Sequence, residues 1–400
     1  MDSNLFEIFL YAAISVGITS TLLQFIITFY EIKFVSQPRS SNTSHELPPV
    51  SIMKPLKGLD DQLEENLRSF FTLDYLKYEI IFGVKESNDS ALKIVLKISS
   101  DYPHVPIRIV ADNRQTGLNP KVNNLANMYP HVTYDHILIS DSNVRVKKDY
   151  LRRILPYLQM PQVGLVTCTI RGSGARRIGA LMENLHLNGF IAASILTTQR
   201  LFKFPISVGK SMLMKGQVLE EIGGFAKFRN VLAEDHLINE ALRARGYKVI
   251  TTPCIIDNVN ESWSTGRFIS RHVRWGKMRK NIKLSGYLGE FFANPIFTGF
   301  LHLLFFFNVQ SLILFMLVSL IKSAMDWAIS RLLNSDLKFY QFGLIPVKDI
   351  IIGVVWFIPF FSRTVSWRGN HFRIFKNSQL SPLKSGGFDA AIDYQQQFVE

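Results

Sequence analysis

The sequence predicts an α/β domain with a mostly parallel sheet, flanked by helices that cross a membrane. Two observations support this prediction. Between residues 48 and 283, short β-type runs alternate with stretches of helical periodicity, and that order favours a parallel sheet covered on both faces. Long apolar segments lie on either side of this region, and hydrophobic residues make up 47% of the 400 residues, which leaves apolar sequence beyond a packed core.

The first apolar segment covers residues 8–30 and contains no charged residue. A helix rises about 1.5 Å per residue, so this segment is long enough to cross the hydrocarbon core of a bilayer. A cleaved signal peptide is the alternative, but Asp2 and Glu7 precede the segment and no basic region does. We therefore predict a membrane anchor, with residues 1–7 on the non-cytoplasmic side.

Two further apolar segments lie near the C-terminus. Residues 291–321 carry His302 as their only ionisable group, and their length indicates a transmembrane region rather than a buried core helix. Residues 350–361 form a shorter run beside Lys348 and Asp349. This second membrane segment is expected to be tilted, interfacial or re-entrant, although a buried core helix would explain it as well.

Basic residues beside the apolar segments predict their orientation, because Lys and Arg gather on the cytoplasmic side. Lys33 and Arg39 follow the first segment, and the stretch 267–283 before the second is strongly basic. The tail, residues 362–400, is basic as well, with Arg363, Arg368, Arg373 and Lys376. We expect an integral membrane protein whose tail and catalytic domain, residues 48–283, face the cytoplasm.

The connection 322–349 is expected on the opposite side. The membrane would be that of the Golgi or ER in a eukaryote and the inner membrane in a bacterium. The net charge of +13 does not indicate a nucleic-acid partner, because the basic clusters flank apolar segments and suit lipid headgroups or a nucleotide diphosphate. Cys168 and Cys254 stand singly in apolar surroundings, which predicts buried free thiols.

The middle region has the pattern of a doubly covered sheet. Strands are predicted at 50–53, 78–84, 107–110, 136–140 and 163–167, with helices at 62–71 and 91–99. Ligands of such sheets bind beyond the carboxyl ends of the strands. No G-x-G-x-x-G or Walker loop is present, which argues against a dinucleotide oxidoreductase or a P-loop NTPase.

Polar residues follow several of these strands. Asp141 follows the fourth strand, where a carboxylate can hold Mg²⁺ or Mn²⁺ against a diphosphate, although a turn or helix cap is the commoner role. Asp89 follows the second strand and suits either a nucleoside contact or a helix cap, with Glu86 as a nearby competitor. Lys121 is a candidate for phosphate oxygens, although most single lysines are solvated.

Asp235 opens an amphipathic helical pattern that ends at Gly246, so it lies at or near a helix N-terminus. Capping is its simplest role, but a helix N-terminus also keeps a carboxylate ionised, as a catalytic base requires. A second helix is predicted over 267–280, with Arg271 and Arg274 on one stripe and Trp275 on another. That helix suits a membrane interface, with or without a role in phosphate binding.

Taken together, Asp89, Asp141, Asp235 and the R-H-V-R-W motif at 271–275 resemble the D, D, D, (Q/R)-x-x-R-W pattern of ceramide glucosyltransferases. The resemblance extends over most of the chain. Its further pieces are M-K-P-L-K-G at 53–58, N-P-K-V-N-N-L at 119–125, the glycine pair at 223–224 and S-W-R at 366–368.

The resemblance implies a GT-A nucleotide-sugar transferase fold, with Asp89 and Lys121 at the nucleotide-sugar and Asp141 at a metal ion and the diphosphate. It implies Asp235 as base, and places the motif at 271–275 around the diphosphate or acceptor. UDP-glucose and ceramide are the substrates it implies, joined with inversion, and Mg²⁺ or Mn²⁺ is the cofactor. The alternatives are another UDP-sugar, another lipid such as a hopanoid or diacylglycerol, and an inactive lipid-binding scaffold.

Overall fold

The structure is a computed structural model that describes residues 3–35, 47–367 and 370–383. Arg39 and Arg368, two of the basic residues used to predict orientation, lie outside the described residues, as do the first two residues of the chain and the tail beyond residue 383.

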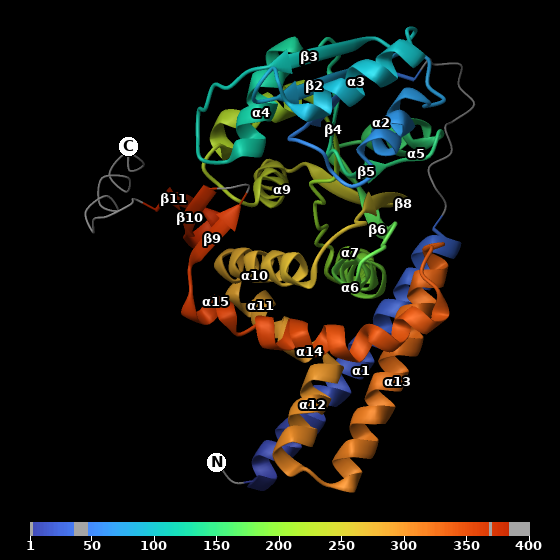
Figure 1. The fold of residues 1–400 in the computed structure, drawn as a ribbon, viewed down its shortest axis with the longest axis vertical. Helices are drawn as coiled ribbons and strands as arrows, with labels where there is room; N and C mark the ends of the chain where they lie inside the picture. The colour runs from blue at the N-terminus through green and yellow to red at the C-terminus, as the bar shows by residue number, and fades with distance from the viewer. Residues whose placement is uncertain (1–2, 36–46, 368–369, 384–400) are drawn as a thin grey trace.

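An eight-stranded mixed sheet forms the centre of the α/β domain, in the order β3-β2-β1-β4-β7-β6-β8-β5 (Figure 1). Strands β1 to β4 are parallel, as are β6 and β8, whereas β7 runs antiparallel between β4 and β6. The five predicted strands are confirmed, and β5, β7 and β8 were not predicted. The strands are β1 (Val50–Pro55), β2 (Tyr78–Val84), β3 (Ile107–Ala111), β4 (His136–Ser140), β5 (Val144–Arg145), β6 (Val163–Ser173), β7 (Ser211–Lys215) and β8 (Lys248–Val259).

Helices cover both faces of the sheet, because alternate residues of each strand point to opposite faces. Ile52 and Ile80 belong to one hydrophobic cluster, whereas their neighbours Met53 and Ile81 belong to the other. The first cluster packs under α2 (Leu63–Phe71), α3 (Ser90–Asp101) and α5 (Tyr150–Leu158). The second packs under α4 (Pro120–Met128), α8 (Gly216–Glu221) and α9 (Glu234–Ala244).

Within the part of the chain that the structure describes, three helices are long and apolar enough to cross a membrane, at Asn4–Lys33, Val309–Leu332 and Phe339–Phe361. A pair of helices bent by 64° would make a fourth span. The α1, α12 and α13 helices run together away from the α/β domain, while α14 lies across the top of this bundle (Figure 1). The elements are α1 (Ser3–Lys33), α11 (Leu284–Phe292), α12 (Pro295–Phe306), α13 (Val309–Leu332), η4 (Phe339–Leu344), α14 (Ile345–Val355) and α15 (Ile358–Phe361).

The apolar region 291–321 is divided in the structure. Phe307 adopts a left-handed conformation, and Asn308 begins α13 with a capping box closed by Ser311. The α13 helix then continues to Leu332, because Lys322 pairs with Asp326 one turn later and both side chains are buried.

The connection 322–349 therefore does not lie on the side away from the catalytic domain, contrary to our expectation. The Arg171 guanidinium of β6 donates a hydrogen bond of 2.8 Å to the Leu333 carbonyl oxygen, at the end of α13. The Gly174 amide donates to the Asp336 carboxylate at 2.9 Å. These hydrogen bonds show that the stretch after α13 lies against the α/β domain.

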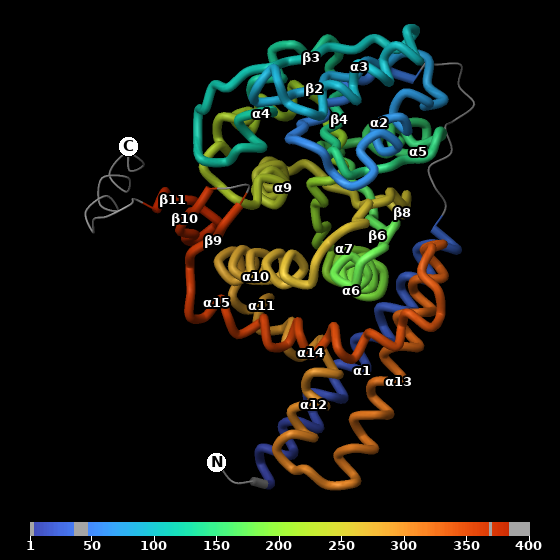
Figure 2. The backbone as a smooth tube through the Cα atoms, viewed as in Figure 1, coloured from blue at the N-terminus to red at the C-terminus, as the bar shows by residue number. Residues whose placement is uncertain are grey.

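A group of helices joins the α/β domain to the apolar bundle, and the tail folds back beside it (Figure 2). The helices are α6 (Ile178–His186), the π-helical turn η2 (Leu187–Ile191), α7 (Ala192–Phe202) and the basic helix α10 (Thr265–Ile282). The tail forms a small antiparallel sheet of β9 (Thr364–Trp367), β10 (Asn370–Ile374) and β11 (Leu380–Pro382), with η5 (Lys376–Ser378) between the last two. This sheet packs its apolar face on Leu232, just before α9.

The packing of α14 on α12 can be tested by substituting a glycine at the contact. A Cβ added to Gly353 would lie 2.0 Å from the Phe297 ring, whereas one added to Gly343 meets nothing within 4 Å. We expect Gly353→Ala to cost about 1–3 kcal/mol through overpacking, and so to lower the thermal unfolding midpoint in detergent by several degrees. Gly343→Ala is the matched control. Equal midpoints for the two variants would contradict this packing.

Candidate active site

Lys121 lies at the centre of the polar cluster beyond the carboxyl end of β4. Its ammonium nitrogen is 2.9 Å from an Asp141 oxygen and 3.0 Å from a Glu234 oxygen, and it donates to the Gly209 carbonyl at 3.0 Å. Asn119 caps α4 by accepting from the Lys121 and Val122 amides, which fixes Lys121 in the first turn. The side chain is thus buried and fully paired rather than solvated.

A second lysine, Lys210, holds the other oxygen of Asp141. Its ammonium group lies 2.9 Å from Asp141 Oδ2 and donates to Asn143 Oδ1 at 2.7 Å. The buried Lys54 reaches the same place from β1, where it donates to the Asp141 backbone carbonyl at 2.7 Å. Lys210 was not predicted. It directly precedes β7. Because β7 runs antiparallel to its neighbours β4 and β6, it begins at the edge of the sheet where they end.

These contacts determine the ionisation of Asp141. Burial alone would favour the neutral acid, but Lys121 and Lys210 together hold the pKa of Asp141 well below its ordinary value. Burial would likewise favour neutral Lys121, yet the carboxylates of Asp141 and Glu234 raise the pKa of that lysine. Asp141 and Lys121 therefore stay ionised near neutral pH.

Asp235 lies in the first turn of α9 but does not cap it. The cap position is Ala233, and Asp235 instead accepts hydrogen bonds from the Gly209 amide at 2.9 Å and the His236 amide at 2.8 Å. A Cβ on Gly209 would lie 2.8 Å from Asp235 Oδ2, so only glycine permits this approach. Burial, followed by the Glu234 carboxylate, raises the pKa of Asp235, while Lys121 opposes the rise.

The tail sheet supports the start of α9. The Ala233 amide donates to Ser378 Oγ at 3.1 Å, and the Leu232 amide donates to the Ser378 carbonyl at 2.9 Å. Ser378 is fully buried in a left-handed conformation. Ser378 lies 145 positions after Ala233 in the chain and supplies a partner that no local cap provides. No pattern in the sequence predicts this contact.

Asp89 caps α3, which is one of the two roles predicted for it from the sequence. It accepts from the Ala91 amide at 2.9 Å and from the Gly58 amide at 3.0 Å. Because β2 and β4 both flank β1 in parallel, Asp89 and Asp141 follow strands that end at the same edge of the sheet. Asp89 therefore caps α3 and also lies at this edge of the sheet, on the loop that follows β2.

Arg271 of α10 is held by aromatic rings and by a buried carboxylate. Its guanidinium lies 4.1 Å from the centre of the Trp275 ring and 5.1 Å from that of Trp263. Its Nε is 3.0 Å from Glu183, a fully buried residue of α6 that also contacts His272 at 3.0 Å. Arg274 lies on the same helix and is partly buried. Glu183, which was not predicted as a site residue, forms an ion pair with this arginine.

Comparison with known proteins supports the predicted fold. A mannosyltransferase from Pyrobaculum calidifontis, solved with GDP-Man and Mn²⁺, superposes with a TM-score of 0.52 at 17% identity and covers 88% of this chain and 98% of that one. This similarity confirms the predicted GT-A-type fold.

The similarity to relatives in sequence extends beyond the α/β domain into the apolar helices. Ceramide glucosyltransferase 3 of Caenorhabditis elegans is 30% identical over 378 residues, which are 90% of this chain and 82% of that protein. Ceramide glucosyltransferase 1 of the same organism is 30% identical over 64% of this chain and 54% of its own length. The sequence pattern of glycosyl transferase family 21 matches residues 10–380. The chain therefore belongs to glycosyl transferase family 21.

Proposed function

We propose that this enzyme transfers glucose from UDP-glucose to the primary hydroxyl of ceramide, with inversion at the anomeric carbon. One observation supports the proposal most strongly. A carboxylate of raised pKa, Asp235, lies beside a cationic cluster built on Asp141, Lys121 and Lys210. A sugar transferase needs both parts, a base for the attacking hydroxyl and positive charge for the departing diphosphate.

The donor would lie along the carboxyl edge of the sheet. Asp89, on the loop after β2, is proposed to contact the nucleoside, with Lys121 and Asp141 beside the sugar and diphosphate. Arg271 is already oriented by Glu183 and two tryptophans, and guanidinium forks pair well with phosphate oxygens. Arg274 and Trp275 would complete this side of the site, next to the acceptor.

The chemistry needs one displacement. As the acceptor oxygen bonds to the anomeric carbon, Asp235 takes the hydroxyl proton, and the bond from that carbon to the phosphate oxygen breaks with its electron pair leaving on UDP. No covalent enzyme intermediate is required. Lys121 and Lys210 can then neutralise charge that appears on the diphosphate in the transition state.

The oxygen atoms of the cluster also suit Mg²⁺ or Mn²⁺, because carboxylate and amide oxygens are their preferred ligands. Asp141 would hold the ion, aided by Asn143, and when bound the ion would neutralise diphosphate charge. Both Asp141 oxygens contact lysine nitrogens, so a metal ion at this carboxylate would compete with Lys210 and Lys121. Among the described residues, no group of three His, Cys, Asp or Glu side chains is arranged to hold a metal ion.

We further propose that the α/β domain faces the cytoplasm. Lys33 ends α1 on the side of that domain, and the basic helix α10 lies between the domain and the apolar helices (Figure 1). UDP-sugars would then reach the sheet edge from the cytoplasm while the lipid arrives from the bilayer. This arrangement fits the Golgi or ER membrane of a eukaryote or the inner membrane of a bacterium.

The function and its base can be tested together in proteoliposomes. We expect UDP release from UDP-glucose only when ceramide is present, and a loss of about 10²- to 10⁴-fold in kcat for Asp235→Asn. UDP binding should stay within about threefold, because the amide keeps the size of the carboxylate. Glu240→Gln, on the exposed face of the same helix, is the control and should keep wild-type turnover.

Near-normal turnover of Asp235→Asn would exclude Asp235 as the base. Faster transfer to diacylglycerol or a hopanoid than to ceramide would assign another acceptor. Absence of transfer from every UDP-sugar tested, with intact lipid binding, would favour a scaffold.

Competition between Lys210 and a metal ion gives a separate prediction. Removing a hydrogen-bonded cation worth roughly 1.5–3 kcal/mol should tighten Mn²⁺ binding by about tenfold or more in Lys210→Met. Electron paramagnetic resonance of free and bound Mn²⁺ measures this without turnover. Lys215→Met, at the other end of β7, is the control. Unchanged Mn²⁺ affinity in Lys210→Met would place the ion away from Asp141.

A further inference from the structure

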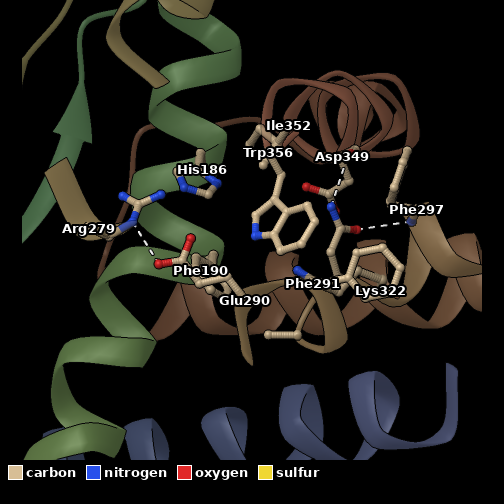
Figure 3. Close-up of a pocket in the computed structure, with 13 residues that line it drawn as sticks. His186, Phe190, Arg279, Glu290, Phe291, Phe297, Lys322, Asp349, Ile352 and Trp356 are labelled. Carbon is tan, nitrogen blue, oxygen red and sulfur yellow. Dashed lines mark hydrogen bonds and ion pairs between the residues drawn. The ribbon is translucent and has the colours of Figure 1, made fainter. Parts of the chain in front are cut away.

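A small cavity with both polar and apolar walls lies where the α/β domain meets the apolar helices (Figure 3). Its volume is about 40 Å³, room for about three or four water-sized groups at roughly 10–15 Å³ each. Its walls come from α6, α10, α11, α12, α13 and α14 and from the turn η2. The residues that matter for the argument are His186, Arg279, Glu290, Phe297, Asp349 and Trp356.

Three buried polar atoms that line this cavity lack a hydrogen-bond partner among the described residues, namely His186 Nδ1, Arg279 Nε and Asp349 Oδ2. Of these, Arg279 Nε lies 2.7 Å from Glu290 in an ion pair. His186 and Asp349 are each only 5% exposed. An unsatisfied buried polar atom costs about 1–3 kcal/mol, so such atoms are normally paired or solvated. In Figure 3, His186 and Asp349 lie on either side of the Trp356 ring, and all three residues line the cavity. His186 and Asp349 are placed to hydrogen-bond something that enters it.

The charges around the cavity balance. Arg279 is 2.7 Å from Glu290, Lys322 pairs with Asp326, and Asp349 pairs with Lys348. Burial lowers the pKa of His186 well below its ordinary value, so this ring is neutral. A site with three ion pairs and no surplus charge suits a neutral polar group, whereas a phosphate would add an uncompensated buried charge.

Aromatic side chains line the remaining walls. The Phe291 and Trp356 rings are 5.3 Å apart, and Phe291 and Phe297 are 6.1 Å apart. The Trp356 indole nitrogen already donates to the Tyr287 carbonyl at 2.9 Å, so its ring offers only an apolar surface. An occupant of this cavity would therefore combine polar groups with hydrocarbon. Neutral lipids that carry hydroxyl or amide groups have that character.

A continuous set of contacts links the cavity to the candidate active site. The His186 ring lies 4.7 Å from the His272 ring, and His272 shares Glu183 with Arg271. Arg271 and Arg279 are eight residues apart on α10, a rise of about 12 Å along the helix. A lipid held at the cavity is thus about two helical turns from the arginine proposed to contact the donor.

We infer that this cavity is a membrane-side subsite, which holds the hydroxyl or amide groups of the neutral lipid acceptor before transfer. The inference rests on the proposed function, since it assigns a location to the acceptor of that reaction. His186 and Asp349 bind the polar head, and the aromatic walls contact the adjoining hydrocarbon. The lipid then moves along α10 toward Asp235.

The test uses the full-length protein in lipid nanodiscs. Ile352→Trp fills the cavity from α14, and Val354→Trp on the same helix, where the side chain is 56% exposed, is the matched control. We expect Ile352→Trp to raise the KM for ceramide by at least about tenfold, with UDP affinity within twofold of wild type. His186→Phe, which keeps a ring and loses the nitrogens, should raise that KM in the same direction. This second variant tests the subsite even if Ile352→Trp fails to fold.

Cross-linking locates the lipid without turnover. A photoactivatable ceramide should label peptides containing Phe190 or Phe297 in the wild type, and ceramide or diacylglycerol should compete while phosphatidylserine should not. Wild-type KM in both variants, or labelling confined to other peptides, would overturn the inference. Competition by phosphatidylserine would overturn the neutral-lipid assignment. Labelling at the cavity without any sugar transfer would support the subsite and reject the proposed function instead.

Discussion

The ammonium group of Lys121 joins the end of β4 to the start of α9, because it contacts both Asp141 and Glu234. These two carboxylates come from segments more than 90 positions apart, and each would be costly to bury without a cation. Lys121 also fixes the Gly209 carbonyl, while the Gly209 amide holds Asp235. The position of the proposed base thus depends on the same lysine that keeps Asp141 ionised.

The basic helix α10 extends this arrangement toward the membrane. Its Arg271 lies on the side proposed for the donor and its Arg279 lines the cavity, and Glu183 of α6 forms an ion pair with Arg271. The tail sheet packs beside the start of α9 and so adds support from a third direction. In this account, the donor reaches the cluster from the sheet edge and the acceptor from the apolar helices, and they meet near Asp235.

The sequence was most informative where local rules determine the structure. Strands β1 to β4 are short apolar runs bounded by polar turns, and two of the predicted site residues, Asp89 and Asp141, follow β2 and β4. The β8 strand was missed because Pro253 interrupts it, at a register irregularity in its pairing with β6. Lys210 and Ser378 reach the site only through an antiparallel strand and a folded tail. The continuation of α13 through Lys322 depends on burial of its ion pair, which a hydropathy pattern does not show.

The pH dependence of kcat tests the central claim that the charges around Asp235 set its activity as a base. The carboxylate must be ionised, so activity is lost as the pH falls through its raised pKa. Lys121→Met removes the cation that lowers this pKa and should move the acid limb to higher pH. Glu234→Gln removes a neighbouring negative charge and should move it to lower pH. Shifts in these opposite directions are the predicted result, and an acid limb that stays fixed in both variants would contradict the account.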